Sequence, residues 1–273
     1  MTVTLLQALL PAGAMESYGW RIPFLLAGPL GLVGLYIRLR LADTPQFAEL
    51  SKAQQVASSP LKEAVSTAWR SILQVIGLMI IFNIGYYVVF TFLPTYFIKT
   101  LHFSKTNAFV SITLASLVAL VLILPLAALS DRVGRRPMLI AGSLAVAIFG
   151  YPMFLLLNSG SLVAAIAAQC GLAVIEAVYV SSAVAVGVEL FATRVRYSGF
   201  SIGVNICVAA FGGTTPYVVT WLTASTGNNV APAYYVVVAA IVSLLTILTI
   251  LTILTILTIR ETAGRPLRQG VAD

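Results

Sequence analysis

The sequence predicts an all-α integral membrane protein with seven transmembrane helices. Hydrophobic residues make up 59% of the chain and charged residues only 9%, and the mean hydropathy is +0.98. A chain of this composition cannot cover itself with a normal soluble surface, which excludes a soluble globular protein. Apolar runs long enough to cross a bilayer core of ~30 Å alternate with short polar segments, and this alternation predicts repeated membrane crossing.

The first complete span is expected at residues 22–37. The apolar stretch before it, residues 1–14, is too short to cross and is interpreted as the end of a helix whose beginning is missing. A polar segment, residues 38–70, follows; Thr44-Pro45 and Ser59-Pro60 predict the starts of short surface helices there. Six further spans are expected at residues 71–98, 107–129, 138–157, 162–188, 199–223 and 231–259.

The last expected span is unusual because Thr-Ile-Leu repeats almost without variation from Thr246. A three-residue step turns ~300° around a helix, so the threonines mark no single face. We expect this repeat to have no functional role, and residues 260–273 to form a polar tail.

The basic residues predict the orientation of the chain. Three lie in one set of polar segments: Arg21, Lys99 and Lys105. Thirteen lie in the other set: Arg38, Arg40, Lys52, Lys62, Arg70, Arg132, Arg135, Arg136, Arg194, Arg196, Arg260, Arg265 and Arg268. Lysine and arginine concentrate in cytoplasmic loops, so this distribution places the linker at 38–70 and the C-terminus in the cytoplasm.

The most informative polar stretch is residues 129–136, Leu-Ser-Asp-Arg-Val-Gly-Arg-Arg, between two apolar runs. Its charges cannot lie in hydrocarbon, so it must turn at a membrane face. Gly134 permits a tight turn, and Pro137 suits the first turn of the next helix, whose positive N-terminal end would lie near Asp131. The stretch resembles the loop signature of the major facilitator superfamily, although Ala127 replaces the glycine usual two positions before the leucine.

The resemblance extends over most of the chain. Residues 19–24, 43–47, 86–87, 93–96, 189–199, 231–235 and 261–262 are similar to the sixth to twelfth helices of bacterial metabolite:proton symporters, the relatives of proline/betaine, α-ketoglutarate and shikimate permeases. Ala192 stands where proline is usual. Nothing resembles the first four helices of that family. The resemblance therefore implies a six-helix C-terminal domain at residues 71–259, preceded at 1–37 by a helix stub and one span.

The members of this family are transporters. The resemblance therefore implies secondary active, proton-coupled transport of a small polar metabolite or osmolyte across the bacterial inner membrane. The substrate would lie at midplane between two six-helix halves that rock about it. The missing N-terminal half would have to come from another polypeptide or from sequence upstream. The alternative interpretation is an inactive or accessory membrane fragment with no transport activity of its own.

Candidate site residues fall into two groups. The first is a gate at the cytoplasmic loops, which the resemblance implies: Asp131, Arg132, Gly134, Arg135, Arg136, Arg194 and Arg196. The second is a proton or substrate site inside the membrane, where Glu176 is the only ionisable residue deep in a span. Asn83 and Asn205 could bind the substrate or simply join helices. Four aromatic residues could form a wall for a quaternary ammonium group or serve only in packing: Tyr86, Tyr87, Tyr217 and Trp221.

Several classes of function have no support in the sequence. The chain shows no nucleophile–base pair or phosphate loop, so we expect no enzyme and no cofactor. His102 has no neighbouring ligands for a metal, and Cys170 and Cys207 lie in apolar runs without a disulfide framework. The net charge of +7 is divided among the loops, which argues against a nucleic-acid surface.

Overall fold

The computed structural model describes residues 5–6, 9–11, 13–40 and 59–256, with side chains to residue 250. These residues form helices and no strand: α2 (Ala14–Ser17), the 3₁₀ turn η1 (Gly19–Arg21), α3 (Ile22–Arg40), α5 (Pro60–Thr67), α6 (Trp69–Tyr86), the π-helical segment η2 (Tyr87–Phe92), α7 (Leu93–Lys99), α8 (Lys105–Val133), α9 (Arg135–Leu157), α10 (Leu162–Glu189), α11 (Arg196–Cys207), the π-helical segment η3 (Val208–Gly212), α12 (Thr215–Thr226) and α13 (Ala231–Ile256). The helix start predicted at Ser59-Pro60 is confirmed, whereas Thr44-Pro45 lies outside the described residues.

Within the described residues, seven stretches of helix are long and apolar enough to cross a membrane, which confirms the predicted number. Two of them are not continuous α-helices. The second span consists of α6, η2 and α7, and the sixth of α11, η3 and α12. Each π-helical segment is followed closely by a proline, Pro94 or Pro216, which has no N–H to continue the α-helical ladder.

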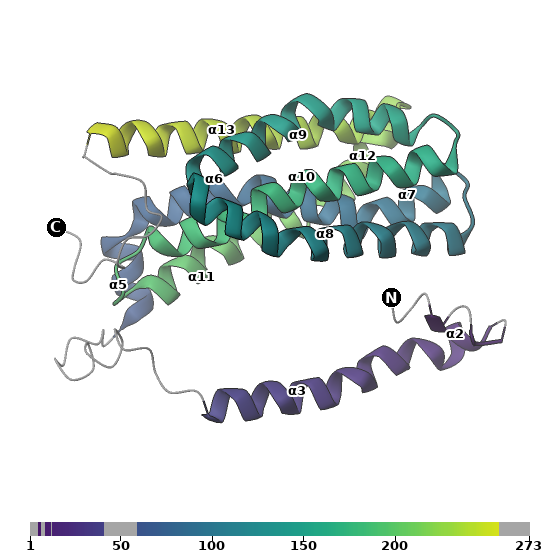
Figure 1. Ribbon diagram of the computed structural model, residues 1–273, viewed down its shortest axis with the longest axis horizontal. Helices are drawn as coiled ribbons and strands as arrows, with labels where there is room; N and C mark the ends of the chain where they lie inside the picture. Colours follow the sequence, from purple (N-terminus) through teal and green to yellow (C-terminus); the bar gives the residue numbers. More distant parts are fainter. Residues whose placement is uncertain (1–4, 7–8, 12, 41–58, 257–273) are drawn as a thin grey trace.

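Helix α10 occupies the centre of the bundle and packs against α8, α9 and α6 (Figure 1). Its close approach depends on small side chains, since Ala165, Ala168, Ala173 and Ala183 are all fully buried. Helix α13 packs against α9 and α6, and α11 packs along α6. Gly203 of α11 permits this close packing, because a Cβ placed there would meet Val75 of α6.

Helix α3 lies apart from this bundle in Figure 1. None of its residues is buried. The three-residue spacing of Gly28, Gly31 and Gly34 predicts a close helix contact, but a Cβ added at any of them would have no neighbouring atom within 4 Å. That expectation is wrong for the described part of the chain: the helix forms, but its small-residue face packs against nothing in it.

A side chain of another helix bonds to the backbone of α6. The Ser243 hydroxyl of α13 accepts a hydrogen bond from the Ile81 N–H (3.1 Å) and donates one to the Gly77 carbonyl (2.9 Å). In a continuous α-helix these two backbone groups bond to each other. One residue further on, the Tyr179 hydroxyl of α10 donates to the Leu78 carbonyl at 2.6 Å. Three helices are thus joined at this turn of α6.

Candidate functional site

A groove of about 570 Å³ with a charged side chain in its lining lies between the second span (α6 and η2), α8 and α10. One wall carries three aromatic side chains, Phe82, Tyr86 and Phe90, and the apolar residues of the opposite wall come from α8. The rings of Tyr86 and Phe90 lie 5.4 Å apart between centroids, and those of Phe82 and Tyr86 lie 6.4 Å apart. The periodicity of α6 into η2 therefore lines one face of the groove with a continuous aromatic strip.

Glu176 of α10 contributes the only charged group of this groove. Its residue surface is 5% exposed, and its Oε1 atom is buried without a hydrogen-bond partner. Gly85 makes room for the carboxylate, because a Cβ at that position would collide with it. A buried carboxylate without a partner is costly in hydrocarbon, and it favours either a proton or a cationic ligand group as its partner.

The other intramembrane candidates lie in different surroundings. Asn83 is buried but faces α11: its amide donates to the Met79 carbonyl at 2.9 Å and lies 3.5 Å from Cys207 Sγ. Tyr87 packs against Gly212 of η3. Asn205 is exposed, and its amide donates to the Ser201 carbonyl one turn earlier. Of the predicted polar and aromatic set, only Tyr86 lines the groove together with Glu176.

Tyr217 and Trp221, suggested as further wall for a quaternary ammonium, lie on α12 and are exposed at 74% and 57%. They are not part of the groove lining. The aromatic wall is formed instead by Phe82 and Phe90, two residues that the sequence alone did not single out. Their signal in the sequence was the four-residue spacing from Phe82 through Tyr86 to Phe90, which places all three on one helix face.

A second polar site lies where α8, α9, α10 and α11 end. Its central pair is Arg135 of α9 and Glu189 of α10, whose guanidinium and carboxylate form an ion pair with side chains 15% and 17% exposed. Asp131 lies 3.4 Å from the same guanidinium, but its side chain is 69% exposed. Glu189 was absent from the predicted gate residues, because nothing local in the sequence shows that the C-terminus of α10 reaches the 130–137 loop.

The turn in this loop is built as predicted, but Asp131 is placed differently. Gly134 has φ +107° and separates α8 from α9. Asp131 lies in the last turn of α8, which continues to Val133. It therefore lies at the negative end of its own helix, and its carboxylate is 3.4 Å from the guanidinium of Arg135, the first residue of α9.

The arginines of the loop between α10 and α11 do not converge on Asp131, contrary to expectation. Arg194 Nε lies 2.7 Å from Glu63 Oε1 of α5, an ion pair whose N–H is not aligned as a hydrogen bond. Arg196 Nε donates to the Phe191 carbonyl at 3.2 Å, and its charge interacts with that of Glu189. Arg132 is exposed and Arg136 half-buried.

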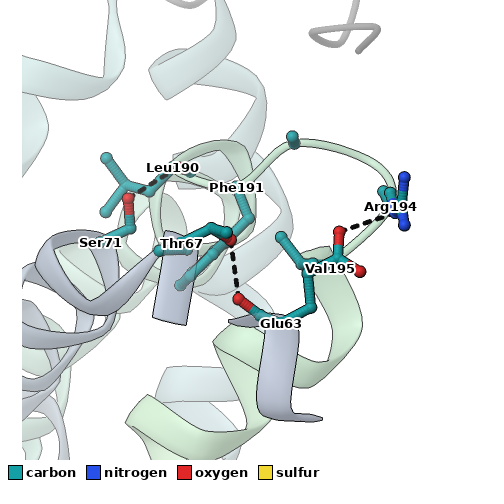
Figure 2. Close-up of a pocket in the computed structure, with 9 residues that line it drawn as sticks. Glu63, Thr67, Ser71, Leu190, Phe191, Arg194 and Val195 are labelled. Atoms are coloured by element: carbon teal, nitrogen blue, oxygen red, sulfur yellow. Dashed lines mark hydrogen bonds and ion pairs between the residues drawn. The ribbon is translucent and has the colours of Figure 1, made fainter. Parts of the chain in front are cut away.

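Helix α5 docks on this end of the bundle beside a small pocket of about 60 Å³ (Figure 2). Figure 2 shows Glu63 and Arg194 facing each other across its rim, with the Ser71 hydroxyl donating to the Leu190 carbonyl at 3.1 Å. Ala64 is fully buried in the contact. The segment before the second span is thereby fixed to the connection between α10 and α11.

Within the described residues, no group of three or more histidine, cysteine or acidic side chains is placed to hold a metal ion.

The two polar sites, the groove and the charged end of the bundle, differ in chemistry. The groove offers one carboxylate and aromatic faces to a small ligand, and the charged end offers ion pairs between helix termini that can form or separate as the helices move.

Known proteins resemble this chain over most of its length. The family model of the Major Facilitator Superfamily matches residues 3–215. The chain is 36% identical over 276 residues to a proline/betaine transporter of Escherichia coli K12, covering 97% of this chain and 53% of that transporter. It is equally similar to a glycine betaine/proline/ectoine/pipecolic acid transporter of Dickeya dadantii, and 34% identical over 236 residues to an ectoine/proline transporter of Corynebacterium glutamicum, covering 82% of this chain and 47% of that protein.

The chain thus spans about half the length of the curated relatives that it matches. No solved structure matches it. The relatives are named transporters and not enzymes, and the seven candidate spans are those of a multi-pass membrane protein. A family model that covers most of the chain, relatives at this identity and a bundle of apolar helices lead to one conclusion: the chain belongs to the major facilitator superfamily.

Proposed function

We propose that this chain is the C-terminal part of a proton-coupled transporter of a small zwitterionic solute of the proline or betaine type, working by alternating access. The observation that carries the proposal is the groove in which the unpartnered Glu176 carboxylate shares a lining with Phe82, Tyr86 and Phe90. The relatives are named for proline, betaine and ectoine, all of which carry a cationic nitrogen.

The groove supplies the two interactions that a cationic nitrogen needs away from water. The carboxylate provides the opposite charge, and ring faces attract the cation by about 1–2 kcal/mol each when water is excluded. No basic residue lines the groove. The solute carboxylate would therefore be held by the facing half of the transporter, since substrates of such transporters lie between the two halves.

The same carboxylate is our candidate for the proton site. A symporter carries proton and solute together, so a Glu176 that holds the proton would be neutral while the solute is bound and would leave the cationic end to the ring faces. A Glu176 that stays charged would instead bind the cationic end and carry no proton. Asn83, Tyr87 and Asn205, which lie outside the groove, would act in helix contacts and not in binding.

The charged end of the bundle is proposed to be the cytoplasmic gate. The distribution of lysine and arginine supports this orientation, with residues 38–70 and 260–273 in the cytoplasm and the chain in the bacterial inner membrane. In one state, the ion pair of Arg135 with Glu189 would hold the ends of α9 and α10 together, and that of Arg194 with Glu63 would hold α5 to the connection between α10 and α11. Domain boundaries follow the same scheme, with residues 1–37 as stub and span and 71–259 as the six-helix domain.

The alternative is an inactive or accessory fragment. Uptake of labelled proline and betaine should be compared in osmolyte-transport-deficient cells that express this chain alone, the N-terminal half of the Escherichia coli proline/betaine transporter alone, or both. Uptake that requires this chain supports the proposal. If no combination shows uptake although the chain is present in the membrane, the result supports the interpretation as an inactive or accessory fragment.

Glu176→Gln tests the coupling in whichever form shows uptake. A proton role predicts that uptake driven by a pH gradient is lost while solute exchange across the membrane continues. A role in solute binding alone predicts that both are lost. Glu16→Gln is the control, because Glu16 is an exposed carboxylate with a side chain 83% exposed. Unchanged pH-driven uptake in Glu176→Gln would remove this residue from the mechanism.

A further inference from the structure

The π-helical segment η2 leaves one backbone carbonyl without a donor of its own. The Leu93 N–H bonds to the Val88 carbonyl, five residues back. In an α-helix it would bond to Val89, four residues back. The next residue, Pro94, has no N–H. Leu93 and Pro94 are the two residues of the following turn that could donate a backbone hydrogen bond to the Val89 carbonyl, and neither does.

Gln169 of α10 supplies the missing donor. Its amide Nε2 lies 2.8 Å from the Val89 carbonyl, and its amide oxygen accepts a hydrogen bond from the Ser111 hydroxyl of α8. Gln169 and Ser111 are both fully buried. The orientation of the amide is determined by its partners, because a carbonyl can only accept, which leaves the amide oxygen for the hydroxyl. One side chain thus joins η2, α8 and α10.

The position of this network relates it to the groove. Gln169 lies seven residues before Glu176, about 10 Å along α10, and Ser111 is adjacent to Ile112, which lines the groove. Phe90, on the aromatic wall, directly follows Val89 in η2. Gln169 joins the second span (through η2), α8 and α10, and the same three spans form the groove.

The second π-helical segment is satisfied differently. In and after η3, hydroxyls of the same segment serve the carbonyls: Thr214 donates to Ala210 and Thr215 to Phe211. No other helix is needed for these bonds. The two segments thus differ in their donors: a side chain of α10 serves a carbonyl of η2, whereas these two carbonyls of η3 are served from within their own span.

We infer that Gln169 is a positioning residue of the transport site, which holds η2 at the end of the groove and so fixes the aromatic wall opposite Glu176. This inference rests on the proposed function for its meaning in transport, but the geometric part does not depend on transport. Loss of the amide would leave the Val89 carbonyl and the Ser111 hydroxyl without this hydrogen-bond partner in a dry interior. Segment η2 would then no longer be held to α10 and α8 at this point.

The geometric part is tested by labelling. Phe90→Cys is introduced into the full chain in membrane vesicles, in a background with Cys170→Ala and Cys207→Ala, and its rate of reaction with a small thiol reagent is measured. Gln169→Met keeps the length and removes the amide, and it should raise the rate about fivefold, the size expected for one interhelical hydrogen bond in a membrane. Ser111→Ala should raise it less, because the bond to Val89 remains.

Ser143→Ala is the matched control. Ser143 is also fully buried, but its hydroxyl bonds only to the Leu139 carbonyl of its own helix, α9. It should leave the labelling rate unchanged. A parental rate in Gln169→Met overturns the inference; if that variant does not reach the membrane, a parental rate in Ser111→Ala does so.

The functional part is tested in the form that shows uptake. Gln169→Met should raise the KM for the solute about fivefold with Vmax per folded molecule unchanged, whereas a merely structural loss would lower the amount of folded protein and leave KM alone. An unchanged KM overturns the positioning role even if labelling rises. If no form shows uptake at all, the proposed function fails and the labelling result alone decides whether Gln169 holds η2.

Discussion

The ion pair between Arg135 and Glu189 gives the sharpest quantitative prediction for the charged end of the bundle. Both side chains are more than four-fifths buried, whereas Asp131, the other carboxylate at the same guanidinium, is 69% exposed and 3.4 Å away. Breaking a buried pair by removing one partner costs about 3–5 kcal/mol, and an exposed pair contributes about 0–1 kcal/mol.

Glu189→Gln should therefore destabilise the folded chain much more than Asp131→Asn. Since Asp131 remains near Arg135 in the first variant, we expect a loss of about 2–3 kcal/mol, below the full cost of a broken buried pair. Asp131→Asn should cost less than about 1 kcal/mol. The double variant leaves Arg135 with neither carboxylate, so its cost should exceed the sum of the two single costs by about 1 kcal/mol.

The assay is denaturant unfolding of the purified chain in detergent micelles, with the parent, both single variants and the double variant measured side by side. The midpoint and the slope are both recorded, because a changed slope would mean that the folded or unfolded state itself has changed. Equal losses for Glu189→Gln and Asp131→Asn would show that exposure does not determine the strength of these contacts. Strict additivity would show that the two carboxylates do not share the guanidinium.

Three further predictions concern topology and packing. A cysteine replacing Lys105 should react with an impermeant thiol reagent in whole cells and one replacing Val133 should not; the opposite pattern contradicts the proposed orientation. Gly203→Val should destabilise the chain by about 1–3 kcal/mol in the same unfolding assay, because the added atoms collide with α6, and a neutral result would show that the helices can separate there. Ser243→Ala should lower the free energy of unfolding by about 0.6–2 kcal/mol, because the hydroxyl that bonds to the Gly77 carbonyl and the Ile81 N–H of α6 is lost. Unchanged stability would show that α6 does not need these bonds.

Local sequence determined the number of spans, the turn at Gly134 and the start of α5. Each depends on neighbouring residues: a long apolar run must cross the bilayer, a glycine allows φ +107°, and a proline suits the first turn of a helix. Glu176 could also be selected from the sequence, because a carboxylate deep in an apolar run is unusual wherever the helix packs. The predicted last span, residues 231–259, is helical as far as it is described, from Ala231 to Ile256, and the remaining residues and the tail lie outside the described part of the chain.

Only the tertiary structure decided which helices meet and therefore which polar groups become partners. Glu189 and Arg135 lie 54 residues apart, and Gln169 and Val89 lie 80 apart, so no spacing rule connects them. The same reason applies to Tyr217 and Trp221, which have suitable side chains for an aromatic wall but lie on α12 and do not line the groove. A span's composition is determined by the bilayer, which acts on every helix alone, whereas its partners depend on packing between helices, where small residues and single hydrogen bonds decide the contact.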